Sequence, residues 1–325
     1  MKAERCTMMD KKNTLDFFPG AAKNFSVTIF DHLEDAVACL DVDQKILFWN
    51  KAAGQMSGRD DAEVLGKVCF DELGLFVDTE GLSLCKGKCP FRLTLKDGVE
   101  RTLDVYLQHK EGFRIPVTLR VIPVPNDAGE IVGAAGVFVN TAPKVTIPLG
   151  VVQLERMGLI DPDTGIASKQ YLDMTLKTRL EEFQKYNLPF GLIYVDVDNY
   201  DRILEKHGRF NAGKILRTVA RTLHKNVRFF DIVGRWSTEE FLVILLNIDE
   251  GRLDIVANKL RLLIGESYIT TETGMLNATV SMGASLVLRY DSVDSLVKRG
   301  EQLMMHSKWL GKNRVSLSFV QKDME

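Results

Sequence analysis

The sequence predicts a two-domain protein of mixed α and β structure, in which an antiparallel sheet with flanking helices is followed by a mixed sheet surrounded by helices. Three observations predict this fold class. The chain has 325 residues, too many for one ordinary compact core and suitable for two. In its first half, two short strands and small helices precede three strands joined by hairpin-type turns. In its second half, strands alternate with longer helices around a single hairpin.

The first domain is predicted from short strands that turn residues separate. The strand candidates are rich in β-branched and aromatic residues, and Gly, Asn and Asp mark the turns between them. In chain order we expect strands over 36–41 and 45–50, small helices within 51–66, a helix over 90–96, and strands over 100–108, 114–123 and 131–139.

The second domain is predicted from apolar runs of strand length between longer helical patterns. Its strands and helices alternate, so we expect helices to pack around the sheet. In chain order we expect a helix over 169–186, a strand over 190–196, helices over 200–207 and 212–227, hairpin strands over 231–235 and 241–246, a helix over 253–265, a strand over 277–288, a helix over 292–307 and a strand over 314–319.

The boundary between the domains is placed where Pro143, Pro148 and Gly150 interrupt the regular pattern. A short amphipathic helix over 149–159 could follow this break. The predicted divisions are a tail over 1–26, the first domain over 27–142, a linker over 143–160, the second domain over 161–319 and a tail over 320–325.

Composition excludes several classes of function. Lys and Arg number 42 against 44 Asp and Glu, a net charge of −2, and no stretch is dense in basic residues, so we expect no nucleic acid polymer as partner. No apolar run approaches the ~20 residues of a membrane helix, so we expect no membrane insertion. The start lacks the apolar stretch of a signal peptide, and five cysteines do not make a disulfide framework. We therefore expect a cytoplasmic protein with reduced thiols.

Three pairs of charged residues could carry chemistry in the second domain. Carboxylates at strand ends can hold Mg²⁺, which relies on substrate phosphates for its other ligands, and lysines can neutralise those phosphates. The pattern favours nucleotidyl or phosphoryl transfer, although each pair could also be an ordinary strand end, hairpin tip or basic helix terminus. The pairs are Asp196 and Asp198 after a buried strand, Glu239 and Glu240 in the hairpin, and Lys308 and Lys312 near the end of the last helix.

The segment Arg235-Trp236-Ser237-Thr238-Glu239-Glu240-Phe241 resembles the signature of GGDEF domains, the diguanylate cyclases of bacterial cyclic-di-GMP signalling. The resemblance spans about residues 161–319 and includes Asp-Pro-Asp-Thr-Gly at 161–165, Val-Asp-Val-Asp at 195–198, Ser-Met-Gly at 281–283 and Lys-Trp-Leu-Gly-Lys-Asn at 308–313. It implies an adenylyl-cyclase-like mixed sheet.

The resemblance also implies roles for individual residues. Asp196 and Glu239 would coordinate Mg²⁺, and Glu240 would assist the metal and the attacking 3′-hydroxyl. Lys308 and Lys312 would hold the phosphates. Each subunit of a homodimer would bind one GTP, or another nucleotide, and two facing subunits would join them.

The sequence departs from the family at the nucleotide pocket. Ser237 and Thr238 replace the two signature glycines, and Thr238 adds bulk and resists a positive φ. Leu204 and Gly213 stand where the family reads guanine with an Asn and an Asp, and each lost polar contact costs about 1–3 kcal/mol of discrimination. Ser168 replaces a further Asn. We therefore expect weak or absent activity on GTP; the alternatives are an active diguanylate cyclase or a cyclase with altered base preference.

Arg228-Phe229-Phe230-Asp231 fits the RxxD inhibitory site of the same family and lies shortly before the signature. There the arginine would bind a phosphate or guanine of cyclic-di-GMP, for which a guanidinium is well shaped. The alternative is a plain surface ion pair between Arg228 and Asp231.

Residues 27–142 resemble a PAS sensor domain, through the segments 41–53, 109–117 and 129–133. The resemblance implies an antiparallel sheet that binds a small ligand or transmits a signal as a dimer. The ligand is not readable from the sequence. Cys69, Cys85, Cys89 and His109 could hold zinc or iron, or the thiols could react with oxidants beside Lys86 and Lys88; the alternative is that the cysteines are small buried apolar residues and no cofactor is bound.

Overall fold

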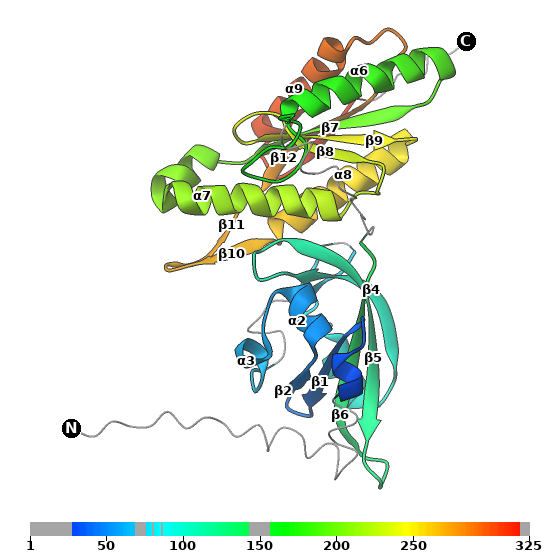
Figure 1. Ribbon diagram of the computed structural model, residues 1–325, viewed down its shortest axis with the longest axis vertical. Helices are drawn as coiled ribbons and strands as arrows, with labels where there is room; N and C mark the ends of the chain where they lie inside the picture. Colours follow the sequence, from blue (N-terminus) through cyan, green and yellow to red (C-terminus); the bar gives the residue numbers. More distant parts are fainter. Residues whose placement is uncertain (1–27, 69–75, 80, 86, 143–156, 319–325) are drawn as a thin grey trace, which may run out of the picture. The chain divides into compact units, whose positions relative to one another are not determined.

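The structure is a computed structural model, and it describes residues 28–68, 76–79, 81–85, 87–142 and 157–318. These residues form two compact units. The first unit contains a six-stranded sheet, and the second contains a five-stranded sheet and a separate two-stranded ribbon (Figure 1). The prediction of two α and β units with different sheets is confirmed.

The sheet of the first unit has the strand order β2-β1-β6-β5-β4-β3. The pairs β1–β2, β1–β6, β5–β6 and β3–β4 are antiparallel, as predicted for this half of the chain. Its elements are β1 (Ala36–Asp41), β2 (Ile46–Trp49), α2 (Lys51–Ser57), α3 (Asp61–Val64), β3 (Phe76–Val77), α4 (Pro90–Asp97), β4 (Arg101–Gln108), β5 (Arg114–Pro125) and β6 (Ile131–Asn140).

Asn50 makes the transition from β2 to α2. Its side-chain oxygen accepts from the backbone N–H groups of Val37 and Ala53, each at 2.9 Å, so it caps the helix and joins it to β1. Its amide nitrogen donates to the carbonyls of Phe30 and Asp35. This buried side chain therefore uses all of its hydrogen-bonding capacity to fix the start of α2.

The sheet of the second unit has the order β13-β12-β7-β9-β8, with β12 and β13 parallel and the other pairs antiparallel. It is the mixed sheet that the sequence predicts. Its unit contains α6 (Lys169–Tyr186), β7 (Phe190–Val197), α7 (Tyr200–Lys225), β8 (Ile232–Arg235), β9 (Glu240–Leu246), α8 (Glu250–Gly265), β10 (Tyr268–Thr271), β11 (Gly274–Asn277), β12 (Val280–Leu286), α9 (Val293–Trp309) and β13 (Val315–Leu317).

Strand β7 is buried on both faces because helices cover both sides of this sheet (Figure 1). Ile193 and Val195 belong to the apolar cluster that includes residues of α7 and α8. The alternate residues Leu192 and Tyr194 belong to the cluster that includes residues of α6 and α9. The period-2 alternation of a strand thus divides one continuous apolar run between two cores.

Helix α9 lies very close to β12. A Cβ atom at Gly283 would overlap the carbonyl oxygen of Gly300 and the backbone nitrogen of Met304. Only glycine therefore fits at this point of the strand. The close approach fixes the height of α9 above the sheet.

Some predicted elements differ from the structure. The strand expected over 277–288 corresponds to β12, which is shorter at both ends, and Asn277 belongs instead to β11; the ribbon formed by β10 and β11 was not predicted. The helices expected over 200–207 and 212–227 form one helical segment, α7, which is interrupted at Gly208, where φ is 75°. The two-residue strand β3 was also missed, since such a short strand has no periodicity. Most of the helix expected over 149–159 lies outside the described residues. Among the described helices, none is both long and apolar enough to cross a membrane.

Candidate functional site

Carboxylates gather where β7 ends and β9 begins. The antiparallel register places Glu240 opposite Asp196, and the backbone N–H of Val197 donates to the Glu239 carbonyl at 3.2 Å. Asp196 is buried, with 4% of its surface exposed. From the far side, Lys308 at the end of α9 brings its Nζ to 2.7 Å from Asp196 Oδ1. The structure therefore brings four of the predicted residues together from three elements.

The acidic residues perturb one another. Burial raises the pKa of Asp196 to about 6; the hydrogen bond and charge of Lys308 oppose this rise, and Glu240 and Glu239 add to it. Burial also raises the pKa of Glu239, followed by the charges of Asp201 and Glu240. Such mutual repulsion would be relieved by a cation, and carboxylate oxygens are the ligands that Mg²⁺ prefers.

The carboxylates do not form a ready-made metal centre. In the described part of the chain, no three His, Cys, Asp or Glu side chains converge closely enough to hold a metal ion. The donor type fits Mg²⁺, which takes one or two protein carboxylates and completes its octahedron with water and phosphate. The residues present therefore fit a metal that arrives together with a nucleotide.

Glu240 is held by its neighbours in the hairpin. Ser237 Oγ donates to Glu240 Oε2 at 2.5 Å, and the backbone N–H of Trp236 donates to the Glu240 carbonyl at 2.8 Å. Burial, followed by the charge and hydrogen bond of Glu240, raises the pKa of Tyr194 above its usual range. The carboxylate of Glu240 is therefore an acceptor fixed between a serine and a tyrosine hydroxyl.

Arg235 fixes the turn of the hairpin, a role that the sequence analysis missed. Its Nε and Nη2 donate to the carbonyls of Ser237 and Thr238 at 3.1 and 2.8 Å. Its Nη1 donates to Asp161 and Asp163 in the segment that opens the unit. The signal was present, because an arginine begins the hairpin motif and two aspartates open the domain.

Ser237 and Thr238 do not need a left-handed backbone. Neither is among the residues of positive φ, so the predicted conformational obstacle at Thr238 is wrong. Its additional bulk at the turn remains.

The two lysines are placed by a tight turn after α9. Lys308 is in the last turn of the helix, and Gly311, Lys312 and Asn313 follow with φ values of 113°, 65° and 47°. Lys312 Nζ donates to Asn199 Oδ1, at the start of α7. Both ammonium groups are thus directed toward the end of β7, although they come from opposite ends of the turn.

The predicted base-reading positions lie on α7, on either side of its interruption at Gly208. Leu204 is 37% exposed and lacks a polar group. At Gly213, the nearest heavy atom to an added Cβ would be Arg217 Nη1, at 3.8 Å, so a side chain would fit there. Between these positions, Phe210 is 70% exposed and Lys214 Nζ lies 4.4 Å from its ring centroid.

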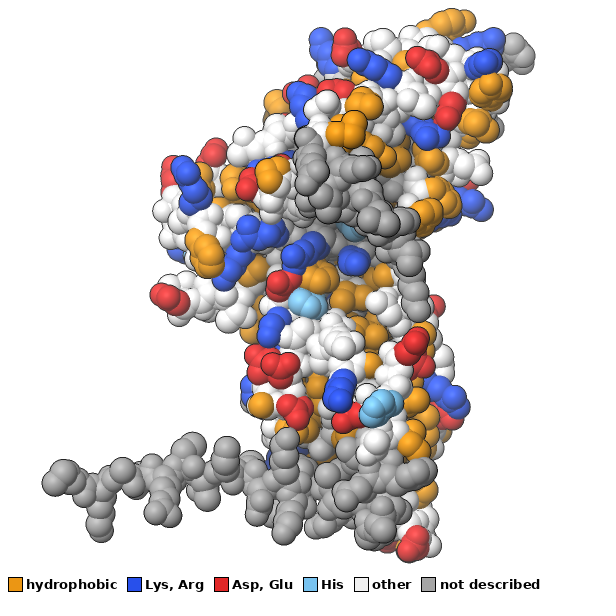
Figure 2. Space-filling view, viewed as in Figure 1, with side chains coloured by type: hydrophobic (Ala, Val, Ile, Leu, Met, Phe, Trp, Pro, Cys, Tyr) orange, Lys and Arg blue, Asp and Glu red, His pale blue; other side chains and the backbone are white. Residues whose placement is uncertain are grey.

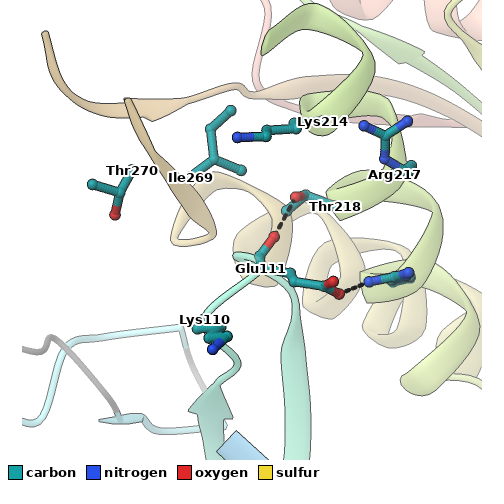
Figure 3. Close-up of a pocket in the computed structure, with 8 residues that line it drawn as sticks. Lys110, Glu111, Lys214, Arg217, Thr218, Ile269 and Thr270 are labelled. Carbon is teal, nitrogen blue, oxygen red and sulfur yellow. Dashed lines mark hydrogen bonds and ion pairs between the residues drawn. The ribbon is translucent and has the colours of Figure 1, made fainter. Parts of the chain in front are cut away.

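Basic side chains gather along α7 (Figure 2). Farther along the helix, Lys214, Arg217 and Thr218 line a pocket together with Ile269 and Thr270 of β10 (Figure 3). This part of α7 therefore presents cationic groups.

Asp231 fixes the turn before β8. Its Oδ2 accepts from the backbone N–H of Arg228 at 2.9 Å, and its Oδ1 accepts from that of Leu246 at 3.0 Å. The Arg228 guanidinium lies 5.8 Å from the ring of Phe230. The contact between Arg228 and Asp231 thus uses the arginine backbone, and the guanidinium is on an exposed surface beside an aromatic ring.

In the first unit, Cys85 and Cys89 are buried, and Cys89 precedes Pro90 at the start of α4. Burial raises the pKa of the Cys39 thiol, in β1, to about 11, so this cysteine is an apolar core residue. In the described residues, Cys85, Cys89 and His109 do not by themselves form a metal site. Cys69, the fourth predicted ligand, and Lys86 lie outside the described residues.

Comparison with known protein families assigns both parts of the chain. Residues 34–142 match the PAS domain family, and residues 159–314 match the family described as diguanylate cyclase, GGDEF domain.

Two curated proteins illustrate the similarity of the second half. The chain is 27% identical over 183 residues to diguanylate cyclase A of Treponema denticola, across 55% of this chain and 49% of that protein. It is 27% identical over 162 residues to the response regulator PleD of Caulobacter vibrioides, across 49% of this chain and 36% of that protein. The chain therefore spans about half the length of these relatives or less.

Solved structures match the same half. The GGDEF domain of DgcB from Caulobacter crescentus in complex with c-di-GMP aligns with a TM-score of 0.48 and 20% identity, over 49% of this chain and 93% of that one. Diguanylate cyclase SiaD in complex with its activator SiaC, from Pseudomonas aeruginosa, aligns with a TM-score of 0.49 and 23% identity, over 51% of this chain and 64% of that one.

Proposed function

Because the chain carries a PAS domain followed by a GGDEF domain, we propose that it is a bacterial sensory signalling protein of the cyclic-di-GMP system. In this proposal the PAS domain, over 27–142, regulates a GGDEF domain, over 161–319, that has weak or no activity on GTP and binds cyclic-di-GMP at Arg228 and Asp231. The protein works in the cytoplasm as a homodimer.

The observation that carries the proposal is a difference within the candidate site. Asp196, Glu240 and Lys308 lie together, as phosphoryl chemistry needs. The base-reading positions, Leu204 and Gly213, offer neither a carboxylate nor an amide. A site that can bind phosphates but cannot recognise guanine supports nucleotide binding with poor turnover of GTP.

The residues would divide the work as follows. Asp196 and Glu239 would hold Mg²⁺, which would neutralise the phosphates of a bound nucleotide. Lys308 would give up its ion pair with Asp196 and bind a phosphate oxygen instead. Lys312 would likewise give up its hydrogen bond to Asn199 and bind a phosphate oxygen. Glu240, held by Ser237, would accept the proton of the attacking hydroxyl.

The second candidate is an active cyclase, either on GTP or with altered base preference. The arrangement of Asp196, Glu240 and Lys308 favours it, because a domain that only bound a regulator would not need these groups. Leu204 and Gly213 carry no polar side chain with which to read guanine, and this supports a changed base preference in such a cyclase.

The test is product formation by the whole chain with Mg²⁺ and GTP or ATP, resolved by mass spectrometry, with Glu240→Ala as control. Calorimetry with cyclic-di-GMP, on the wild type and Arg228→Ala, accompanies it. The proposal expects little or no product and binding that R228A abolishes. A cyclic dinucleotide that disappears in E240A would instead establish the cyclase, and absence of both product and binding would overturn both nucleotide functions.

A further inference from the structure

The end of β7 is attached to the turn after α9 by three side-chain contacts. Each joins an acceptor in the segment 196–199 to a donor in the segment 308–313. Two of the donors are the lysines already described, and the third is a backbone N–H. The pairs are Asp196 with Lys308, Asn199 with Lys312, and Asp198 with the N–H of Asn313.

Asp198 differs from Asp196 and Asn199 because its buried carboxylate accepts hydrogen bonds on both oxygens from neighbouring residues of the protein. It is 2% exposed. Its Oδ1 accepts from Ser281 Oγ at 2.6 Å, and its Oδ2 accepts from Thr279 Oγ1 at 2.7 Å and from the Asn313 N–H at 3.0 Å. Its own N–H donates to the Thr279 carbonyl at 2.9 Å. With three donors on two buried oxygens, this carboxylate serves hydrogen bonding within the protein.

The turn that Asp198 contacts needs to be held in place. Lys312 and Asn313 both have positive φ; asparagine adopts this conformation readily, but a lysine does so rarely and needs the surrounding structure to hold it. A second contact comes from α8, where Arg261 Nη1 donates to the Asn313 carbonyl at 3.2 Å and to its Oδ1 at 3.0 Å. Asn313 is therefore fixed from two sides, directly beside Lys312.

We propose that Asp198 is a positioning residue for nucleotide binding: it holds the turn 311–313 so that Lys308 and Lys312 face the phosphates, and it is not a metal ligand. This inference rests on the proposed nucleotide site. It separates the two aspartates at the end of β7, since Asp196 exchanges partners when a ligand binds and Asp198 keeps its own.

The experiment compares Asp198→Ala with Asp198→Asn. The asparagine oxygen can replace Oδ2 and accept from Thr279 and Asn313, while its amide nitrogen can donate to Ser281 Oγ, which then acts as acceptor. Alanine removes all three contacts. A positioning role therefore survives in the asparagine variant, whereas a role as a charge or metal ligand is lost in both.

Binding of Mg²⁺ with tripolyphosphate, and of Mg²⁺ with a GTP analogue that cannot react, is measured by calorimetry on the whole chain. We expect D198A to lose about tenfold in affinity for both probes, as for one lost charge-assisted hydrogen bond, and D198N to stay within about threefold of the wild type. Melting temperature is recorded for each variant.

Arg261→Ala provides an independent test if D198A fails to fold, because it removes the hydrogen bonds from α8 to Asn313 and leaves the contacts of Asp198 in place. Arg252→Ala, on the same helix α8, is its matched control. We expect R261A to lose several-fold in affinity for both probes and R252A to lose nothing.

The outcomes separate the two proposals. If the wild type binds the probes and D198N loses as much affinity as D198A, Asp198 acts through its charge and the inference is wrong. It is also wrong if R261A binds as the wild type does. If the wild type binds neither probe, the proposed nucleotide site itself fails, and the inference fails with it.

Discussion

The two ends of the candidate nucleotide site are built differently. At the phosphate end, charged side chains from β7, β9 and α9 are buried or paired, with Lys308 on Asp196 and Ser237 on Glu240. At the base end, Leu204 and Phe210 are exposed on a helix that is interrupted at Gly208. The difference teaches that side chains held by several contacts around the end of β7 have fixed positions, whereas those that project from the exposed surface of α7 do not.

Removing a phosphate ligand should have the largest effect. Lys308→Ala takes away the ammonium that faces Asp196, so affinity for Mg²⁺ and tripolyphosphate should fall about 100-fold, as for a charge-assisted contact in a largely buried site. Lys225→Ala, an exposed lysine at the end of α7, is the control and should change nothing. Equal affinity of both variants would show that the phosphates bind elsewhere.

The acidity of Asp196 gives the second prediction. Its pKa is about 6 in the folded protein against 3.8 ordinarily, so folding strengthens proton binding. Because of this group, the free energy of unfolding without metal should therefore fall by about 2 kcal/mol between pH 4 and pH 7. The stabilising contribution of protonated Asp196 is present at low pH and is lost as the pH rises through 6.

The measurement is denaturant unfolding across this range for the wild type and Asp196→Asn, whose difference isolates the group. Mg²⁺ binding should show the opposite trend and tighten as the pH rises through 6. A difference that does not vary with pH would contradict the raised pKa.

Restoring the base contacts should have a smaller but directional effect. Leu204→Asn with Gly213→Asp supplies an amide and a carboxylate, and Gly213 has room for the new side chain. The preference for GTP over ATP in binding should rise about 30-fold or more, since two polar contacts are added and each is worth about 1–3 kcal/mol of discrimination. Leu204→Ala with Gly213→Ala adds no such groups and should leave the preference unchanged. If the preference of the restored variant stays flat, the base binds at another place.

The smallest effect should come from Phe210. Its ring is largely exposed, so Phe210→Ala should change the free energy of unfolding by less than about 0.5 kcal/mol, measured by denaturant titration. A larger loss would mean that the ring is covered in solution, for example by a second subunit.

The sequence predicts much of this fold and of the phosphate end. The helix over 169–186 is confirmed at both ends, because Ser168 caps its start and Asn187 adopts the left-handed conformation after it. The acidic hairpin also follows from local pattern.

The role of Arg235 and the three contacts of Asp198 could not be predicted in the same way. They depend on which distant segments the sheet order brings together, such as Ser281 of β12 beside the end of β7. The ribbon of β10 and β11 was missed because its residues are mostly polar or exposed and carry little apolar alternation.

The close approach of Gly283 to Gly300 limits what evolution or design can change in this domain. Because the strand and helix backbones approach so closely there, the distance of α9 from the sheet is fixed, and Lys308 lies about two turns farther along the same helix. Two glycines outside the set of candidate site residues thus help to determine where the Lys308 ammonium lies. Replacing Gly283 with alanine would push α9 away from β12, and the Lys308 ammonium would move with the helix.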